Sequence, residues 1–532
     1  MDPSTAYFFL LVLITLLVML DLVALEVMIV FLLAGLLTWV SPSAAIAVAA
    51  IALYDAFINK KHSITKNFPV LGRLRYLFER FRPEIRQYFI EDDRNGLPFN
   101  RADRNYVYRS AKGENNMSGF GSDADFNVSG HFVILQSEFP KNGDDTDVVP
   151  CAKVMGPHRN KPYRPSSIIN ISAMSYGALG ANATTANNIA SLEAGMYHNT
   201  GEGGFSPYHE TADQVVFQIG TGYFGCGITM ADGKTRKFSM PLLLELVSKH
   251  PSIKAIEIKL SQGAKAGKGG VLPAAKVTDE IAAIRGVEVG KSVLSPAQHN
   301  AFNDVDGLID FVEMIADNTG LPVGIKSAVG KSDFWETLAQ RMKERGKGPD
   351  FITVDGGEGG TGAAPAPFAD HVSLPFMDAF PLVYRIFQKN GLTDKTVFIA
   401  SAKLGFPAKS VIAFAMGADL VNIAREIMLS AGCIQAKKCH LGTCPAGIAT
   451  HSWWLNRGFD VNDKSQRVAR FVKTLRKDIL ALTHAAGYEH PSEFRLSDIR
   501  VKDDAALQYR NMSDIYGYEK SLLSIAPKTA SA

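Results

Sequence analysis

The stretch Pro322–Gly360, PVGIKSAVGKSDFWETLAQRMKERGKGPDFITVDGGEGG, contains one complete unit of strand, helix and strand. Its two apolar runs, PVGIKSA and FITVDGG, are short and end at or near glycine, which is typical of buried strands. Between them, SDFWETLAQRMKERG carries apolar residues at helical spacing. A strand, a helix and a second strand in this order predict two neighbouring parallel strands.

The same alternation continues on both sides of this stretch. Further apolar runs are SIINISAM (Ser167–Met174), AIEIKL (Ala255–Leu260), VFIASAK (Val397–Lys403) and DLVNIARE (Asp419–Glu426). Amphipathic stretches such as AAKVTDEIAAIRG and VDGLIDFVEMIADNTG separate the runs. This alternation predicts the α/β class, with a parallel (β/α)8 barrel of the TIM type over residues 151–460. The charged sequence that follows predicts a helical C-terminal extension over residues 461–532.

The N-terminus has a different composition. From Ala6 to Ile58 nearly every residue is apolar, and a membrane span needs about 20 apolar residues. Residues 1–59 are therefore predicted to form a hairpin of about two transmembrane helices. The lysines and arginines between Lys60 and Arg82 then predict an inner-membrane protein whose catalytic domain faces the cytoplasm. Residues 60–150, amphipathic and then polar, are predicted to connect the hairpin to the barrel.

Bulk composition excludes some classes of function. The 532 residues are 46% apolar and 20% charged, as in a folded protein, and the net charge is only +3. Such a balance gives no electrostatic case for binding nucleic acid, so no nucleic-acid partner is predicted. The five cysteines are few, odd in number and clustered, which favours a reducing compartment over a disulfide scaffold.

Three of the cysteines, Cys433, Cys439 and Cys444, share the segment GCIQAKKCHLGTCPAGIAT. Thiolates are the soft ligands that select iron–sulfur clusters or zinc, and proline follows the last cysteine as it often does in cluster loops. A zinc site would need a fourth ligand, which His440 could supply. Three buried structural thiols are the plainer alternative. The absence of a fourth nearby cysteine favours a three-iron cluster, 3Fe–4S, that transfers electrons.

Several blocks together resemble one known family. CHLGTCPAGIAT is similar to the cluster loop of the glutamate synthases, whose FMN domain carries a 3Fe–4S centre beside the flavin. Four more blocks occur in family order: NISAMSYGALG (Asn170–Gly180), HNTGEGG (His198–Gly204), EIKLSQGAKAGKGGVLPAAKV (Glu257–Val277) and DGGEGGTGAAP (Asp355–Pro365). The resemblance covers about residues 150–455. The chain is identified as a glutamate synthase-like FMN protein of a short, membrane-anchored subgroup.

Cofactor contacts are expected at the carboxyl ends of the strands, where barrel active sites lie. A glycine loop after a strand lets backbone N–H groups approach a phosphate. The predicted phosphate loop is Gly359, Gly360, Thr361 and Gly362, with Gly417 and Arg425 as its partners. Lys326 has the position of a cation that stabilises reduced, anionic flavin, a role the resemblance also implies. By resemblance, Ala173, Met174 and Ser175 contact the flavin ring.

Candidate substrate residues follow another strand. Lys259, Gln262 and Lys265 form a cationic and amide cluster suited to a dicarboxylate, and the resembled block helps to hold 2-oxoglutarate. By resemblance, Lys276 is a further basic contact. Glu202 is the candidate for handling protons during imine formation, although a solvated turn glutamate is an equal alternative. The predicted catalytic residues are thus Lys326, Glu202 and Lys259, and His299 is a further candidate.

The chain also departs from the resembled family. It lacks a glutaminase domain and a second glycine fingerprint for a nicotinamide cofactor, so electrons are expected from an external donor, either ferredoxin-like or a membrane redox partner. Ser401-Ala402-Lys403 replaces Asp-Gly-Gly. The predicted function is reduction of the imine of a 2-oxo acid, 2-oxoglutarate with ammonia or an amine, to an amino acid such as glutamate. The alternatives are a membrane-bound amino- or hydroxy-acid dehydrogenase that reduces quinones, and a non-catalytic flavin-binding membrane redox subunit.

Overall fold

A computed structural model describes residues 42–143, 149–231, 235–503 and 508–520 of the 532-residue chain. The chain divides into two compact units, Met1–Ala102 and Asp103–Ala532. The larger unit contains every candidate site residue named above. Each unit is described by itself.

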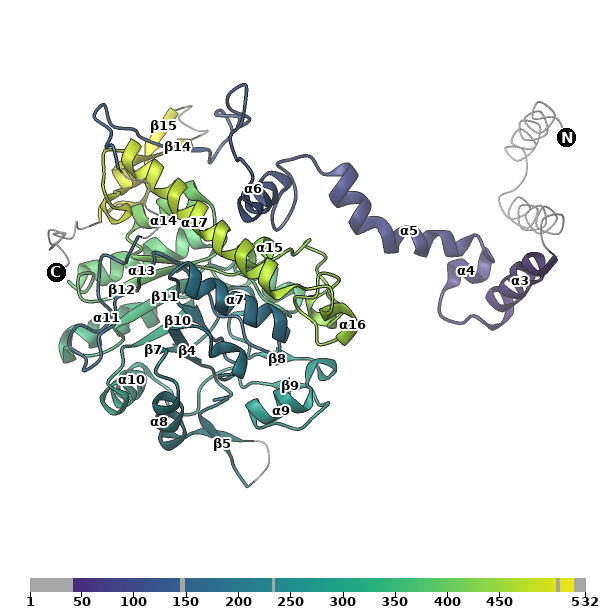
Figure 1. Ribbon diagram of the computed structural model, residues 1–532, viewed down its shortest axis with the longest axis horizontal. Helices are drawn as coiled ribbons and strands as arrows, with labels where there is room; N and C mark the ends of the chain where they lie inside the picture. Colours follow the sequence, from purple (N-terminus) through teal and green to yellow (C-terminus); the bar gives the residue numbers. More distant parts are fainter. Residues whose placement is uncertain (1–41, 144–148, 232–234, 504–507, 521–532) are drawn as a thin grey trace. The chain divides into compact units, whose positions relative to one another are not determined.

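The larger unit is built around a closed barrel of eight parallel strands (Figure 1). In chain order the strands are β2 (Ile169–Ile171), β3 (His198–Asn199), β4 (Val215–Ile219), β7 (Ile253–Lys259), β10 (Val323–Ala328), β11 (Phe351–Asp355), β12 (Val397–Ser401) and β13 (Leu420–Ile423). They follow one another around the barrel in this order, and β13 pairs with β2 to close it. The predicted parallel eight-stranded (β/α)8 barrel is confirmed.

Helices surround the strands (Figure 1). The main ones are α7 (Ala181–Glu193), α8 (Met240–Lys249), α10 (Val305–Thr319), α11 (Asp333–Arg345), α13 (Phe376–Lys389), α14 (Pro407–Met416), α15 (Arg425–Ser430) and α17 (Val461–Ala485). Local sequence fixes their ends: at α10 the Asp304 carboxylate accepts a hydrogen bond from Gly307 N at 2.7 Å, and Gly320 ends the helix in the left-handed conformation. All residues of β10 and β11 are buried, as their apolar runs predict.

One carboxylate lies inside the barrel. Glu257, on β7, is 1% exposed and accepts hydrogen bonds from Asn199 (2.8 Å), Gln218 (2.6 Å) and Thr353 (2.6 Å). These partners come from β3, β4 and β11, so four strands meet at one side chain. Because buried polar groups must be hydrogen-bonded, this network fixes the strands against one another as well as filling the interior.

Smaller elements decorate the barrel. Between β7 and α10 lie β8 (Val271–Leu272), α9 (Asp279–Arg285) and β9 (Val293–Leu294), and between β4 and α8 lies the hairpin of β5 (Gly227–Thr229) and β6 (Arg236–Phe238). α12 (Ala366–His371) follows β11, and α16 (Trp453–Asn456) precedes α17. Short 3-10 helices occupy Pro207–His209, Gly263–Lys265, Ala274–Lys276, Cys439–Leu441, Pro491–Glu493 and Leu496–Asp498. Most of these insertions follow strand carboxyl ends, where they build the site.

The C-terminal part combines a helix with a small sheet. The long helix α17 packs on α7 and α14. Beyond it, β14 (Ile499–Asp503) pairs with β15 (Gln508–Asn511) and with β1 (Phe132–Ile134) in an antiparallel sheet, and α18 (Met512–Tyr516) follows. The helical extension predicted for residues 461–532 therefore also contains strands. Part of the predicted connecting region, β1 and most of α6 (Arg101–Lys112), belongs to the larger unit.

The N-terminal unit contains α3 (Pro42–Leu53), α4 (Ser63–Asn67) and α5 (Gly72–Ile85), with π-helical turns at Tyr54–Ile58 and Arg86–Ile90. In the described ranges no helix is both long and apolar enough to cross a bilayer. This finding overturns the predicted membrane location, since α3 has only 12 residues. Residues 1–41, which make up most of the predicted hairpin, lie outside the described residues.

Candidate active site

The carboxyl ends of β7 and β10 bring two predicted lysines together. Lys259 and Lys326 are register partners on these neighbouring strands, and both are buried, with 9% and 6% of their surface exposed. Lys259 Nζ lies 2.9 Å from Glu202 Oε1 and donates a 2.7 Å hydrogen bond to Gln262 Oε1. Lys259, Glu202 and Gln262 therefore form one cluster, because the loop after β3 meets the loop after β7.

Glu202 is the acidic centre of this cluster. Burial raises the pKa of its carboxyl, but the ion pair with Lys259 and the nearby charges of Lys265 and Arg285 lower it further than burial raises it. The net direction is downward, so Glu202 is ionised at neutral pH. Gly270 lies directly against this carboxylate: a Cβ there would be 2.5 Å from Glu202 Oε1, so a larger residue would displace the carboxylate.

Lys265 lies at the edge of the same cluster. It is 5% exposed, and its ammonium group donates a 3.3 Å hydrogen bond to the carbonyl of Ala363, in the loop after β11. Burial, followed by the charge of Lys259, lowers the pKa of Lys265 to about 8. The ammonium is therefore mostly charged at pH 7 and mostly neutral at pH 9.

Arg285, the last residue of α9, completes the basic lining, and sequence analysis missed it. It is 5% exposed, and burial lowers its pKa to about 10. One Nη donates to Tyr176 O at 2.9 Å and to Ser175 Oγ at 3.4 Å, while Nε has no hydrogen-bond partner among the described residues. A buried guanidinium with an unused donor suits an anion. An arginine at the end of a helix is common, so the sequence alone does not indicate that Arg285 lies in the site.

Lys326 faces the carboxylate of Asp355, which ends β11. The Nζ–Oδ2 distance is 3.6 Å. The same carboxylate accepts hydrogen bonds from Gly263 N at 3.0 Å and from Ser401 Oγ at 2.9 Å. Asp355, at the end of β11, therefore ties the loop after β7 to Lys326 of β10 and to Ser401 at the end of β12. Ser401, which stands where the resembled enzymes have aspartate, takes part in this network.

The predicted phosphate loop lies beside Arg425. A Cβ on Gly360 would be 3.0 Å from Arg425 Nε, and Arg425 Nη2 donates a 2.5 Å hydrogen bond to Glu358 O. The hydroxyl of Thr361 donates to Ala363 O at 3.3 Å, and both Thr361 and Gly362 are exposed. Burial lowers the pKa of Arg425, and the Lys403 ammonium is close enough for the two cations to repel.

Gly417 does not join this loop. It ends α14 with φ +113° and precedes β13, so it lies at the amino end of that strand, whereas Arg425 follows the carboxyl end. Strand β13 separates the two by roughly 13 Å at about 3.3 Å per residue. The Tyr384 ring occupies the space beside Gly417, where a Cβ would be 2.3 Å from its Cε2. The prediction that Gly417 is, like Arg425, a partner of the phosphate loop is wrong.

The residues predicted to contact the flavin ring follow β2 directly. Ala173, Met174 and Ser175 occupy its carboxyl end, and the backbone of Ser175 packs against Gly201 of the loop after β3. His299 supports the next part of the wall: its Nε2 lies 3.0 Å from Lys259 O and its Nδ1 3.1 Å from the Tyr223 hydroxyl. Burial lowers the pKa of His299, so a neutral ring holds the end of β7.

The cysteine loop follows α15. Burial, together with the nearby thiols of Cys439 and Cys444, raises the pKa of Cys433 to about 12. In the described part of the chain no three histidine, cysteine, aspartate or glutamate side chains are arranged to hold a single metal ion. The Tyr108 hydroxyl of α6 donates a 2.7 Å hydrogen bond to Cys433 O. Lys276, predicted among the substrate contacts, lies against this loop instead.

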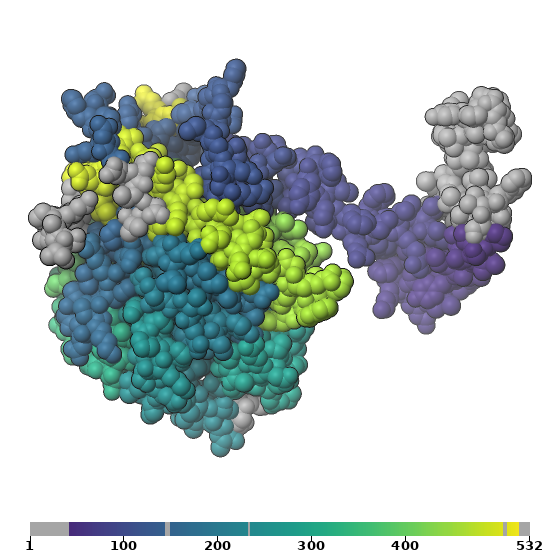
Figure 2. Space-filling view, in the orientation of Figure 1, coloured from purple at the N-terminus to yellow at the C-terminus, as the bar shows by residue number. Residues whose placement is uncertain are grey.

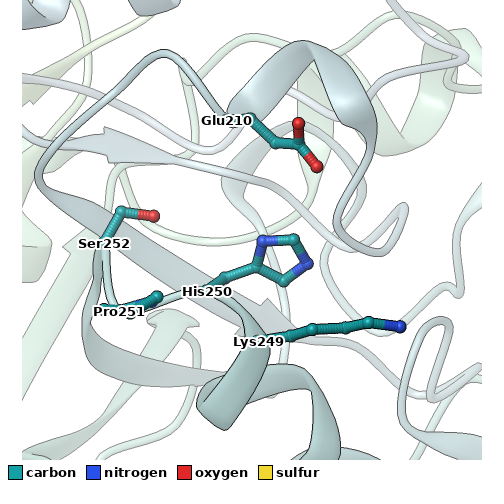
Figure 3. A pocket seen from close by; sticks show the side chains of 5 residues that line it. All are labelled: Glu210, Lys249, His250, Pro251 and Ser252. Atoms are coloured by element: carbon teal, nitrogen blue, oxygen red, sulfur yellow. The ribbon is translucent and has the colours of Figure 1, made fainter.

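A hollow of about 580 Å³ lies away from these residues (Figure 3). Its lining is Glu210, Lys249, His250, Pro251 and Ser252. Ser252 precedes β7, so the hollow is at the amino end of that strand, opposite the end that carries Lys259. Barrel chemistry occurs at the carboxyl ends, so this hollow is not the candidate active site.

Comparisons with known proteins identify a family and several similar chains. Residues 145–489 match the family described as the conserved region in glutamate synthase. The chain is 37% identical over 495 residues to the glutamate synthase large subunit-like protein YerD of Bacillus subtilis, covering 85% of this chain and 93% of YerD. It is 34% identical over 337 residues to the archaeal glutamate synthase (NADPH) of Methanocaldococcus jannaschii, covering 63% and 62%. Among solved structures, mandelate oxidase with (S)-4-hydroxymandelic acid aligns with a TM-score of 0.43 and 15% identity, over 75% of this chain and 98% of that one.

Proposed function

The chain belongs to the glutamate synthase family, and from this premise we propose that it reduces the imine of a 2-oxo acid to an amino acid. The substrates would be 2-oxoglutarate with ammonia or another amine, and the product glutamate or an N-substituted glutamate. The observation that carries this proposal is the buried cluster at the strand carboxyl ends, in which Lys259, Lys265 and Arg285 surround the single carboxylate of Glu202.

The residues present fit FMN. Gly359–Gly362 would offer backbone N–H groups to its phosphate and Arg425 a charge, while Ala173–Ser175 would contact the ring. Lys326, held by Asp355, would supply a cation beside the ring. When bound, FMN would supply the hydride transfer that no side chain can perform.

The cations account for the choice of a dicarboxylate. A dianionic oxo acid needs more than one positive group for charge and orientation, and charge-assisted hydrogen bonds are the strong ones. Lys259 shares its charge with Glu202, so Lys265 and the unused Arg285 Nε add to its attraction for the substrate carboxylates. A hydroxy-acid substrate with one carboxylate would leave part of this buried charge unmatched.

Glu202 would manage the proton. Its lowered pKa keeps it ionised, so it can accept a proton from the amine that attacks the oxo carbon, and Lys259 stabilises the carboxylate between turnovers. Gln262 shares Lys259 and fixes the direction of its ammonium group. In this arrangement Glu202 and Lys259 would act as a coupled base and acid rather than as independent groups.

The three cysteines would hold a 3Fe–4S cluster. Cys439 and Cys444 lie close enough to Cys433 to act on its pKa, and three neighbouring cysteines could each bind a different iron. Electrons would come from a separate acidic donor protein. The surface beside the loop is basic and aromatic, with Lys437, Lys438, Arg457, Trp453 and Trp454 exposed. Figure 2 draws α16, which carries both tryptophans, on the surface in yellow-green.

One experiment tests the proposed reaction. Anaerobically reduced protein is mixed with 2-oxoglutarate plus ammonium, or separately with a quinone analogue, while flavin absorbance is followed. We expect reoxidation by the first mixture, and a Lys259→Met variant should lose it because oxo-acid binding weakens roughly ten- to a hundredfold. Reoxidation by the quinone alone would refute the synthase reaction in favour of a dehydrogenase.

A further inference from the structure

Lys276 lies between the two loops to which the redox groups are assigned. It ends the short 3-10 helix Ala274–Lys276 and is 3% exposed. Its ammonium group donates a 2.9 Å hydrogen bond to the carbonyl of Ala178. Ala178 comes three residues after Ser175, the last of the predicted ring contacts. One end of Lys276 is therefore fixed to the flavin side of the barrel.

The stem of Lys276 packs against the cysteine loop. A Cβ added to Gly442 would lie 3.6 Å from Lys276 Cγ and 3.7 Å from Cε. Gly442 has φ +71° and stands between Cys439 and Cys444, so the chain turns there around the lysine. Both thiols are close enough to act on the Lys276 charge. The same side chain thus contacts the loops of both groups.

We propose that Lys276 is a positioning residue that sets the reduction potential of the iron–sulfur cluster through its positive charge. The inference rests on the cluster proposed above for Cys433, Cys439 and Cys444. A one-electron donor protein would add one electron to the cluster, with no bond formed or broken, and the cluster would become more negative by one charge. A nearby cation stabilises the reduced form, so Lys276 raises the potential.

Packing alone does not require a lysine at this position. An ammonium group loses hydration when it is buried, and a methionine of similar length would fill the same space without that cost. The hydrogen bond to Ala178 offsets only part of the lost hydration. The buried positive charge of Lys276 is explained if it stabilises the neighbouring cluster, which becomes more negative when it accepts an electron.

The test is a redox titration of the full-length protein followed by electron paramagnetic resonance. Lys276→Met should lower the midpoint potential by at least a tenfold change in the one-electron equilibrium, which is about 59 mV. Lys276→Arg keeps the charge and should stay close to the wild type. Lys268→Met, which removes an exposed lysine eight residues away, should leave the potential unchanged.

The outcomes separate this inference from the proposed function. An unchanged potential in Lys276→Met with the cluster intact would overturn the role of Lys276 and leave the cluster standing. A wild-type protein that holds iron and sulfide in no form would overturn the cluster, and the role of Lys276 with it. If Lys276→Met does not assemble the cluster, Lys276→Gln is titrated instead, and a potential equal to that of the wild type counts against the inference.

Discussion

Affinity for 2-oxoglutarate should fall as the pH rises through about 8, because Lys265 loses its proton there. Its pKa is lowered to about 8 by burial and by the charge of Lys259. The affinity falls, rather than rises, with pH because the protonated, charged form of Lys265 is the one that attracts a carboxylate. Binding is therefore strongest below pH 8, and it weakens above that value until the pKa of the bound complex is passed.

The size of the effect follows from the contact. A hydrogen bond to a charged group contributes about 1.5–3 kcal/mol, which corresponds to roughly ten- to a hundredfold in the dissociation constant. Such a contact raises the pKa of Lys265 in the complex by about one to two units, since one unit equals about 1.4 kcal/mol. Between pH 6.5 and pH 9 the affinity should then fall about five- to tenfold. Stopping at pH 9 keeps Arg285, with a pKa of about 10, largely charged.

Isothermal titration calorimetry of the oxidised protein with 2-oxoglutarate, in the absence of ammonium, measures this directly. Lys265→Arg keeps its charge over the whole range, so its affinity should stay level from pH 6.5 to pH 9. Lys265→Met should bind 2-oxoglutarate weakly, and its affinity should likewise not change over this pH range. A wild-type affinity that does not change between pH 7 and pH 9 would show that Lys265 does not contact the substrate.

Two further predictions concern electron entry. Cys439→Ser should lose iron and its paramagnetic resonance signal while the thermal unfolding of the barrel is retained, because the cluster orders only its own loop; retention of iron would contradict the three-thiolate assignment. Replacement of Lys437 and Lys438 by glutamate should raise the dissociation constant for an acidic ferredoxin by at least tenfold at low salt, with the difference shrinking at high salt. Equal binding by the variant and the wild type in surface plasmon resonance would rule out this surface as the docking site.

The barrel could be predicted from sequence because buried parallel strands leave continuous apolar runs. Six of the eight strands fall in runs recognised in that way. Strand β3 escapes because it has only two residues, His198 and Asn199, both polar. Strand β4, Val215–Ile219, is a buried run of the expected kind that was not singled out. Short strands carry too few residues for a period to be recognised.

The site was predictable where a side chain directly follows its strand. Lys259 and Lys326 meet for that reason, since parallel strands end at the same edge. The prediction for Gly417 was wrong because this residue precedes its strand, and a glycine-rich pattern alone does not indicate at which end of the barrel it lies. Arg285 and Lys276 lie in the insertion between β7 and α10, whose path depends on tertiary packing rather than on periodicity.

The carboxylate of Glu257 has a consequence for how this barrel can change over time. Its hydrogen bonds reach β3, β4 and β11: Asn199 and Gln218 both donate to Oε1, and Thr353 donates to Oε2. An apolar residue in place of Thr353 therefore removes the donor to Oε2, and apolar residues in place of both Asn199 and Gln218 remove the donors to Oε1. Leaving either oxygen unsatisfied would cost about 1–3 kcal/mol, whereas replacing the whole set with apolar groups of the same shape could be nearly neutral. The interior is thus inherited as a set: intermediates between the polar and the apolar version are less stable than either, and single substitutions preserve the polar one.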